Sequence, residues 1–235
     1  MVAFAYTAFG LVGFGSTVIA LPLLVHLFAL KFVVPLLMLL DLAAFLLLGA
    51  RVRKRVRYAE IGWLAPFILA GMAAGLFLLI EVAERKLLAV LGIFLLLYAG
   101  YSLLRRGPPA RLTRAWCGPI GFTGGMFSAL FGTGGVLFAL YNAGRIQDKD
   151  ALRATNAAMI MLSSLVRVVL FGAAGLLTQD RLPATALILL PAMLAGAWLG
   201  NRLHAAVPAA AVVKAVYALL VIAGLLLLAR SSLAL

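Results

Sequence analysis

Two charged residues stand inside long apolar stretches of this 235-residue chain. Arg167 lies within the stretch 152–175, and Asp41 lies at the middle of the stretch 32–50. A charged side chain at the centre of a bilayer costs about 2.5–3.5 kcal/mol on insertion scales, so it is expected to face a partner or a wet cavity. The guanidinium of Arg167 has the planar fork that binds an oxyanion through two hydrogen bonds. The carboxyl of Asp41 is a candidate for exchanging a proton.

Glycine-rich breaks interrupt two other apolar stretches, at 13–16 (Gly-Phe-Gly-Ser) and at 132–135 (Gly-Thr-Gly-Gly). A helix that begins inside a membrane leaves its first N–H groups without partners, so such a break must be buried in protein or line a wet cavity. These N–H groups attract anions, and glycine lets a ligand approach the backbone closely. The two breaks therefore predict an anion-binding site within the membrane.

The candidate substrate-binding residues come from both breaks and from one polar helix face: Gly13, Gly15, Ser16, Thr17, Thr133, Gly134, Gly135, Asn156, Ser163 and Arg167. Spacings of seven and four residues place Asn156, Ser163 and Arg167 on the same face. Two other interpretations stay open. The polar side chains could serve only to join helices by hydrogen bonds. Asp41 could form a structural ion pair with Arg167 instead of coupling transport to protons.

The composition identifies the elements that must position these residues as membrane-spanning helices. Hydrophobic residues make up 66% of the chain and charged residues 11%, against about 25% charged residues in a soluble domain. Most apolar stretches are near the roughly 20 residues that a helix needs to cross a bilayer. The stretches are continuous rather than alternating, which excludes a lipid-facing β-barrel. The predicted fold is an all-α polytopic membrane protein.

The chain also repeats itself, since the segment 66–75 recurs at 191–200 with five identical positions. Each half contains one glycine-broken segment followed by three spanning helices. The predicted parts are the first transmembrane repeat at 1–104, a basic cytoplasmic linker at 105–114 and the second transmembrane repeat at 115–235. The glycine pairs Gly71/Gly75 and Gly196/Gly200 are typical of close helix packing. Duplicated halves with broken helices at matching places are typical of secondary transporters.

Basic residues favour one of two arrangements of these halves. If each broken segment re-enters and returns, a half has three crossings and the two halves are inverted. If it crosses, a half has four crossings and the halves are parallel. Cytoplasmic loops carry an excess of Lys and Arg, and the re-entrant arrangement gathers the basic loops 51–57, 105–114 and 144–153 on that side. We therefore expect inverted repeats, each a re-entrant hairpin plus three transmembrane helices, with the parallel arrangement as the alternative.

Several classes of function and partner find no support. The chain has no Ser/His/Asp set, no metal-ligand cluster and no phosphate-binding P-loop, so neither an enzyme nor a cofactor or metal site is expected. The net charge is +13, but no folded module presents the basic residues to a nucleic acid, so no nucleic-acid partner is expected. Attraction of the basic loops to anionic lipid headgroups is expected. A homodimer stays open.

The second break and its surroundings resemble a known family. The stretch Gly125-Met-Phe-Ser-Ala-Leu-Phe-Gly-Thr-Gly-Gly135, followed by Arg153-Ala-Thr-Asn156, is similar to the TauE/SafE family of sulfite exporters, and the similarity runs from about residue 10 to residue 228. This resemblance implies a multi-pass protein of the bacterial inner membrane that exports sulfite or a small organosulfonate such as sulfoacetate.

Together these observations predict a secondary transporter of a small sulfur-containing anion that works by alternating access, with Asp41 as its candidate proton-coupling residue. The alternatives are a passive anion channel, a carrier of another small anion, and a membrane scaffold without flux.

Overall fold

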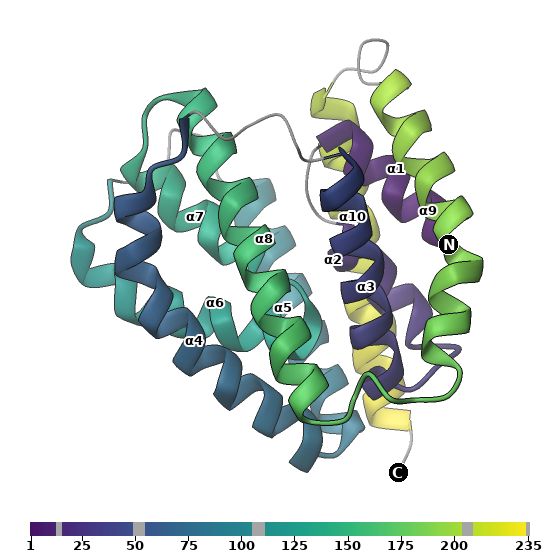
Figure 1. Cartoon of the computed structure of the whole chain (residues 1–235). Coiled ribbons are helices and arrows are strands. Elements are labelled where there is room, and N and C mark those ends of the chain that lie inside the picture. Colours follow the sequence, from purple (N-terminus) through teal and green to yellow (C-terminus); the bar gives the residue numbers. More distant parts are fainter. Residues whose placement is uncertain (13–15, 49–54, 105–110, 204–208, 234–235) are drawn as a thin grey trace.

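The computed structural model describes residues 1–12, 16–48, 55–104, 111–203 and 209–233, and these form helices and short connections without a β-strand (Figure 1). The α-helices are α1 (Val2–Val12), α2 (Ser16–Leu24), α3 (Leu30–Leu48), α4 (Tyr58–Glu81), α5 (Glu84–Leu104), α6 (Cys117–Phe131), α7 (Gly135–Arg145), α8 (Lys149–Ala173), α9 (Leu182–Leu203) and α10 (Ala209–Leu233), and a 3₁₀ turn, η2, covers Arg114–Trp116. An all-α fold is therefore confirmed for the described residues.

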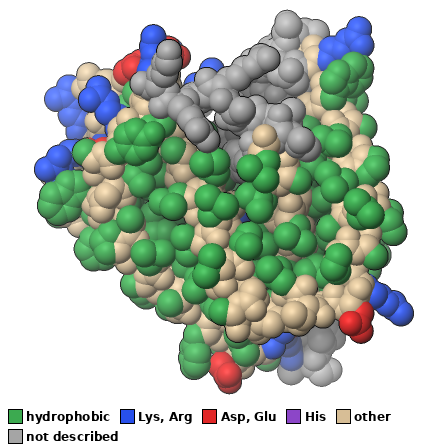
Figure 2. All heavy atoms as spheres, viewed as in Figure 1, with side chains coloured by type: hydrophobic (Ala, Val, Ile, Leu, Met, Phe, Trp, Pro, Cys, Tyr) green, Lys and Arg blue, Asp and Glu red, His purple; other side chains and the backbone are tan. Residues whose placement is uncertain are grey.

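Several of these helices suit a lipid environment. Within the described residues, four helical segments are long and apolar enough to cross a membrane: Tyr58–Glu81, Glu84–Leu104, Lys149–Ala173 and Leu182–Gly200. A helix satisfies its own backbone hydrogen bonds, which is what hydrocarbon demands of a spanning segment. Figure 2 shows hydrophobic side chains over the middle of the visible face, with Lys and Arg gathered toward its upper and lower edges. This distribution is that of a polytopic membrane protein.

The helices α6 and α7 form a hairpin whose two ends lie together. The backbone N–H of Leu112 donates to the carbonyl of Gly144 at 3.1 Å, and the Cys117 thiol lies 2.9 Å from the Tyr141 hydroxyl. The chain reverses at Gly132, which caps α6 in the left-handed conformation with φ of 70°. Glycine adopts this conformation without the steric cost that other residues carry. The second glycine-rich break is therefore the tip of a hairpin.

Helices of the first half pack against helices of the second. The closest pairs are α4 with α6, α1 with α9 and α5 with α10. A Cβ added to Gly71 would lie 2.0 Å from the Phe122 carbonyl oxygen, and one added to Gly196 would lie 2.2 Å from that of Ala3. A Cβ on Gly75 would lie 2.5 Å from a carbonyl of α6. Close helix packing is thus confirmed at these three glycines.

The pair α5 and α10 shows a reciprocal contact. A Cβ on Gly92 would lie 3.0 Å from the Gly224 carbonyl oxygen, and a Cβ on Gly224 would lie 3.0 Å from that of Gly92. Each glycine also faces a leucine of the other helix, Leu228 for Gly92 and Leu96 for Gly224, at the same 3.0 Å. The two helices therefore meet through equivalent surfaces.

The polar contacts fall at two ends of the molecule. At one end, Arg145 pairs with Glu60 at 3.0 Å and Arg55 pairs with Asp150 at 2.5 Å. Arg145 also donates to the Leu112 carbonyl at 3.3 Å, so these contacts bring together the chain before α4, the chain before α6 and the connection between α7 and α8. At the other end, Lys31 donates to the Ile80 carbonyl at 2.7 Å. Arg85 donates to the Ser231 carbonyl of α10, and Arg230 donates to the Val25 carbonyl just after α2. Of the predicted linker 105–114, residues 111–114 lie at the first end, and residues 105–110 lie outside the described ones.

Candidate substrate-binding site

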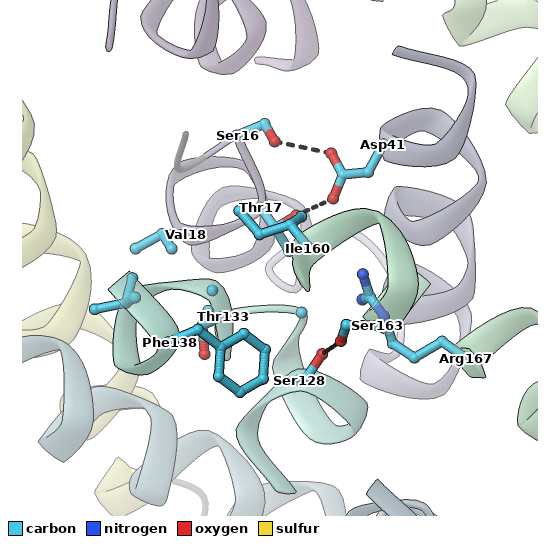
Figure 3. Close-up of a pocket in the computed structure, with 13 residues that line it drawn as sticks. Ser16, Thr17, Val18, Asp41, Ser128, Thr133, Phe138, Ile160, Ser163 and Arg167 are labelled. Carbon is cyan, nitrogen blue, oxygen red and sulfur yellow. Dashed lines mark hydrogen bonds between the residues drawn. The ribbon is translucent and has the colours of Figure 1, made fainter. Parts of the chain in front are cut away.

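A cavity lies where the two halves meet at the starts of α2 and α7 (Figure 3). Its volume is about 40 Å³, counted as the space that the centres of water molecules can occupy. Its lining comes from α2, α3, α6, α7 and α8: Ser16, Thr17, Val18, Asp41, Ser128, Gly132, Thr133, Gly135, Val136, Phe138, Ile160, Ser163 and Arg167. About 10–15 Å³ counted in this way holds one water molecule. The cavity therefore has room for a few waters or for one small anion.

Arg167 brings a buried positive charge to this cavity from α8. The helix begins at Lys149 after an N-cap, because the Asp148 side chain accepts hydrogen bonds from the N–H groups of Asp150 and Ala151. Arg167 is 2% exposed. Its Nη2 donates to Ser164 Oγ at 3.1 Å, while Nε and Nη1 have no hydrogen-bond partner among the described residues. A buried guanidinium with two unused donors is suited to binding an anion.

Asp41 brings the negative charge of the cavity from α3, and it is 6% exposed. Its Oδ1 accepts hydrogen bonds from the hydroxyls of Tyr6 at 2.6 Å and Ser16 at 2.8 Å, and its Oδ2 accepts one from Thr17. An ionised carboxylate is an acceptor only, so three hydroxyl donors match its charged form. The donors come from α1 and α2, which fixes the carboxylate against the first helix break.

Two helix N-termini end at the cavity. α2 begins at Ser16 and α7 begins at Gly135, and both residues line it. A helix N-terminus carries a partial positive charge and unpaired N–H groups. Thr133, one residue before the α7 N-cap, is 1% exposed, and its Oγ1 has no hydrogen-bond partner within the described part of the chain. The partial positive charges of two helix starts thus add to the charge of Arg167.

A pair of serines completes the polar lining. Ser128 on α6 and Ser163 on α8 share a hydrogen bond of 2.6 Å, and both are buried. In Figure 3 the guanidinium of Arg167 lies between this pair and Asp41. Asp41 and Arg167 line the same cavity without forming an ion pair, because the ion pairs of the described residues join other partners. The structure therefore leaves the two opposite charges separately available.

Most of the sequence-predicted site residues that the structure describes reach the cavity. These are Ser16, Thr17, Thr133, Gly135, Ser163, Arg167 and the predicted proton-coupling residue Asp41. Gly134 packs instead against the Gly124 carbonyl and does not line the cavity. Asn156 accepts a hydrogen bond from Asn142 at 2.7 Å and lies away from it. Gly13 and Gly15 lie outside the described residues.

Two polar residues of the site were not singled out from the sequence. Tyr6 hydrogen-bonds to Asp41, and Ser128 lines the cavity. Ser128 stands four residues before Gly132, and this spacing could have indicated it. No signal in the sequence pairs Tyr6 with Asp41, since only the packing of α1 and α3 against α2 brings them together. Clusters of three or more potential metal ligands are absent from the described residues.

Comparison with known proteins identifies close similarity along nearly the whole chain. The family model described as "Sulfite exporter TauE/SafE" matches residues 1–227. A protein of Comamonas testosteroni named "Probable inner membrane transporter protein TsaS" is 32% identical over 194 residues, which cover 81% of this chain and 80% of that protein. No solved structure gives a significant match to the chain.

Proposed function

Since this chain belongs to the sulfite exporter TauE/SafE family, we propose that it is a secondary transporter that exports a small sulfur-containing anion across the bacterial inner membrane. Membership makes it a membrane transporter rather than an enzyme. The observation that carries the proposal is Arg167, a buried guanidinium with two unused donors at a cavity between two helix breaks. The name of the relative TsaS, a probable inner membrane transporter protein, supports the proposal that this chain lies in the inner membrane.

The anion would bind between Arg167 and the N-termini of α2 and α7. Arg167 Nε and Nη1 supply the charged donors, and Thr133 Oγ1 supplies a neutral one. Helix N-termini bind oxyanions through backbone N–H groups without further machinery. Sulfite fits the room of about 40 Å³, whereas sulfoacetate needs the cavity to widen. Sulfite is therefore the first substrate to test.

The re-entrant inverted repeat is the arrangement that we propose for the two halves. The ends of the α6–α7 hairpin lie together at the basic end of the molecule. In Figure 1, α4 and its counterpart α9 run in opposite directions. Ala3 and Phe122, which face the equivalent glycines of those helices, are 119 residues apart, as are Gly13 and Gly132. Rocking of one half against the other around the cavity would then expose the anion to each side in turn.

Asp41 is the residue that we propose for handling a proton during transport. Arg167 and Asp41 are the charged residues of the described lining, so a bound anion leaves the cavity with a net negative charge. A proton bound with the anion reduces that charge, which links transport to a pH gradient. Asp41→Asn is expected to abolish transport driven by a pH gradient in a protein that still binds small anions. Transport that still responds to the gradient would contradict this role.

The experiment that tests the function is counterflow of labelled sulfite and labelled sulfoacetate into proteoliposomes, with and without a pH gradient. With a carrier, uptake of the labelled anion is expected to saturate with its concentration and to be faster when unlabelled anion is present on the opposite side. A passive channel would instead give flux that follows the voltage and does not saturate. A scaffold would give no flux at all. Saturable exchange of either anion supports the proposal, and its absence with folded protein overturns it.

A further inference from the structure

Building on the proposed anion site, we infer that the cavity selects an oxyanion that still carries one proton, such as hydrogen sulfite. Asp41 faces the cavity with a hydrogen-bond acceptor that such a ligand can satisfy and a fully deprotonated one cannot. Arg167 faces the same cavity with donors for the unprotonated oxygens. Specificity then follows from one acceptor and several donors at opposite parts of the site.

The acceptor follows from the hydrogen bonds that Asp41 already makes. A carboxylate has two oxygens with about four acceptor positions in total. Oδ1 uses two of them for Tyr6 and Ser16, and Oδ2 uses one for Thr17. One position on Oδ2 is left for a donor from the cavity. A hydroxyl of a singly protonated oxyanion supplies that donor, whereas an oxyanion without a proton meets the carboxylate lone pair with its own.

The donors follow from the unused atoms on the other side of the cavity. Nε and Nη1 of Arg167 and Oγ1 of Thr133 are buried without a partner among the described residues. Ser128 and Ser163 satisfy one another at 2.6 Å. An oxyanion with two or three unprotonated oxygens can accept from Nη1 and from the second N–H of Nη2, which share one edge of the Arg167 guanidinium, and from Thr133. The protonated oxygen then turns toward Asp41.

Charge gives the same preference as hydrogen bonding. The described lining holds one positive and one negative residue, Arg167 and Asp41. A singly charged ligand leaves a net charge of about −1 in the cavity, and a doubly charged one leaves about −2, which a low-dielectric site disfavours more strongly. The groups that face Asp41 are Tyr6 from α1, Ser16 and Thr17 from α2 and Arg167 from α8. None of these is a second carboxylate or a histidine.

The first test needs only the wild-type protein and three ligands. Dissociation constants of sulfite, methanesulfonate and sulfate are measured by calorimetry at two pH values, one on each side of the pKa of hydrogen sulfite. Methanesulfonate has the single charge of hydrogen sulfite but no proton to donate, and sulfate has two charges and no proton. We expect sulfite to bind more tightly at the lower pH. Methanesulfonate is expected to bind at least about fivefold more weakly than hydrogen sulfite, because its methyl group leaves Asp41 unsatisfied.

Methanesulfonate also separates a proton on the ligand from a proton on the protein. If the protein rather than the ligand took up the proton, methanesulfonate would bind more tightly at the lower pH as well. We expect its dissociation constant to be the same at both pH values. Any pH dependence of sulfite binding then belongs to the ligand.

The second test replaces the acceptor with a donor of similar size. Asp41→Asn is expected to remove the tighter binding of sulfite at the lower pH. It is also expected to strengthen the binding of methanesulfonate and sulfate relative to that of sulfite. Asp180→Asn makes the same chemical change on an exposed loop and is expected to leave the order of ligands unchanged.

Three results have distinct meanings. Methanesulfonate binding as tightly as hydrogen sulfite, or sulfite binding equally at both pH values, would overturn the inference while leaving an anion site in place. Failure of all three ligands to bind folded wild-type protein at either pH would overturn the proposed site itself. The expected order, with its reversal in Asp41→Asn, supports the inference.

Discussion

At the scale of single residues, the site depends on a buried arginine, a buried aspartate and the turn that brings a helix start toward them. The sequence predicted that both charged residues belong to the site, because a charge inside an apolar stretch is costly unless it faces a partner or a wet cavity. It also placed Asn156 in the site from the spacing of a helix face. Asn156 is seven residues from Ser163, which is about 10 Å along a helix. That distance puts Asn156 beside Asn142 instead of the cavity.

Gly132 is the residue whose backbone is most constrained at the site. Its φ is 70°, and an added Cβ would lie 2.6 Å from Thr17 Cγ2 and 3.0 Å from Arg167 Nη1. We expect Gly132→Ala to weaken sulfite binding at least about tenfold and to cost roughly 1–2 kcal/mol of stability through backbone strain. Calorimetric titration and thermal unfolding measure the two effects. Gly172→Ala on α8, where the nearest atom is 3.8 Å from the added Cβ, is the control; an equal loss in it would refute the argument.

At the scale of elements, glycines set how closely α4 approaches α6. The sequence predicted this contact from the i, i+4 spacing, but the partner helix became known only from the fold. Gly71→Ala places a Cβ 2.0 Å from the Phe122 carbonyl oxygen, so the helices must separate. We expect a loss of about 1–3 kcal/mol in the free energy of unfolding, measured by thermal denaturation in detergent.

Gly62 on the same helix provides the matched control for Gly71. A Cβ on Gly62 meets nothing within 4 Å. Since alanine is the better helix former by about 1 kcal/mol, Gly62→Ala is expected to leave stability unchanged or slightly higher. Equal losses in the two variants would show that α4 does not depend on close packing against α6.

An ion pair links α7 of the α6–α7 hairpin to α4, in addition to the packing of α4 against α6. Arg145 donates to Glu60 at 3.0 Å, and Glu60 also accepts from the Tyr141 hydroxyl at 3.1 Å. The two charged side chains are 24% and 13% exposed. Because α7 carries the helix start at the cavity, we expect Glu60→Gln to lower stability by about 1 kcal/mol and to weaken sulfite binding.

The exposed pair of Arg55 and Asp150 is the comparison for this ion pair. Its side chains are 62% and 64% exposed, so Asp150→Asn is expected to change stability by no more than about 0.5 kcal/mol and binding not at all. Thermal unfolding and calorimetry of both variants check the contrast. Sulfite binding unaffected by Glu60→Gln would show that the ion pair does not position the site.

At the scale of the whole molecule, the distribution of basic residues argues for a re-entrant hairpin. The sequence could weigh re-entry against crossing only by counting Lys and Arg, because the breaks alone do not fix the direction of the chain. The contacts of Leu112 with Gly144 and of Cys117 with Tyr141 support re-entry. The pairing of α1 with α9 and α4 with α6 was not predictable, since it depends on long-range packing.

The re-entrant arrangement has a direct consequence for accessibility. In a Cys117→Ser background, cysteines are introduced singly at Thr113, Gln147 and Asp180, which are exposed. We expect a membrane-impermeant thiol reagent to label Thr113→Cys and Gln147→Cys from the same, cytoplasmic side and Asp180→Cys from the other. A crossing segment would put positions 113 and 147 on opposite sides. That labelling pattern would contradict the proposed inverted repeat.

The central claim is that Arg167 binds the transported anion. It is tested most directly by labelled-sulfite counterflow in proteoliposomes with two single variants, in each of which one arginine is replaced by lysine. Arg167→Lys keeps the buried charge but removes the fork of donors, and Arg181→Lys makes the same change at an exposed position. We expect Arg167→Lys to lower the apparent affinity for sulfite at least about tenfold, whereas Arg181→Lys is expected to exchange sulfite like the wild type. Wild-type exchange by folded Arg167→Lys would contradict the account, because the anion would then bind without the guanidinium at the helix breaks.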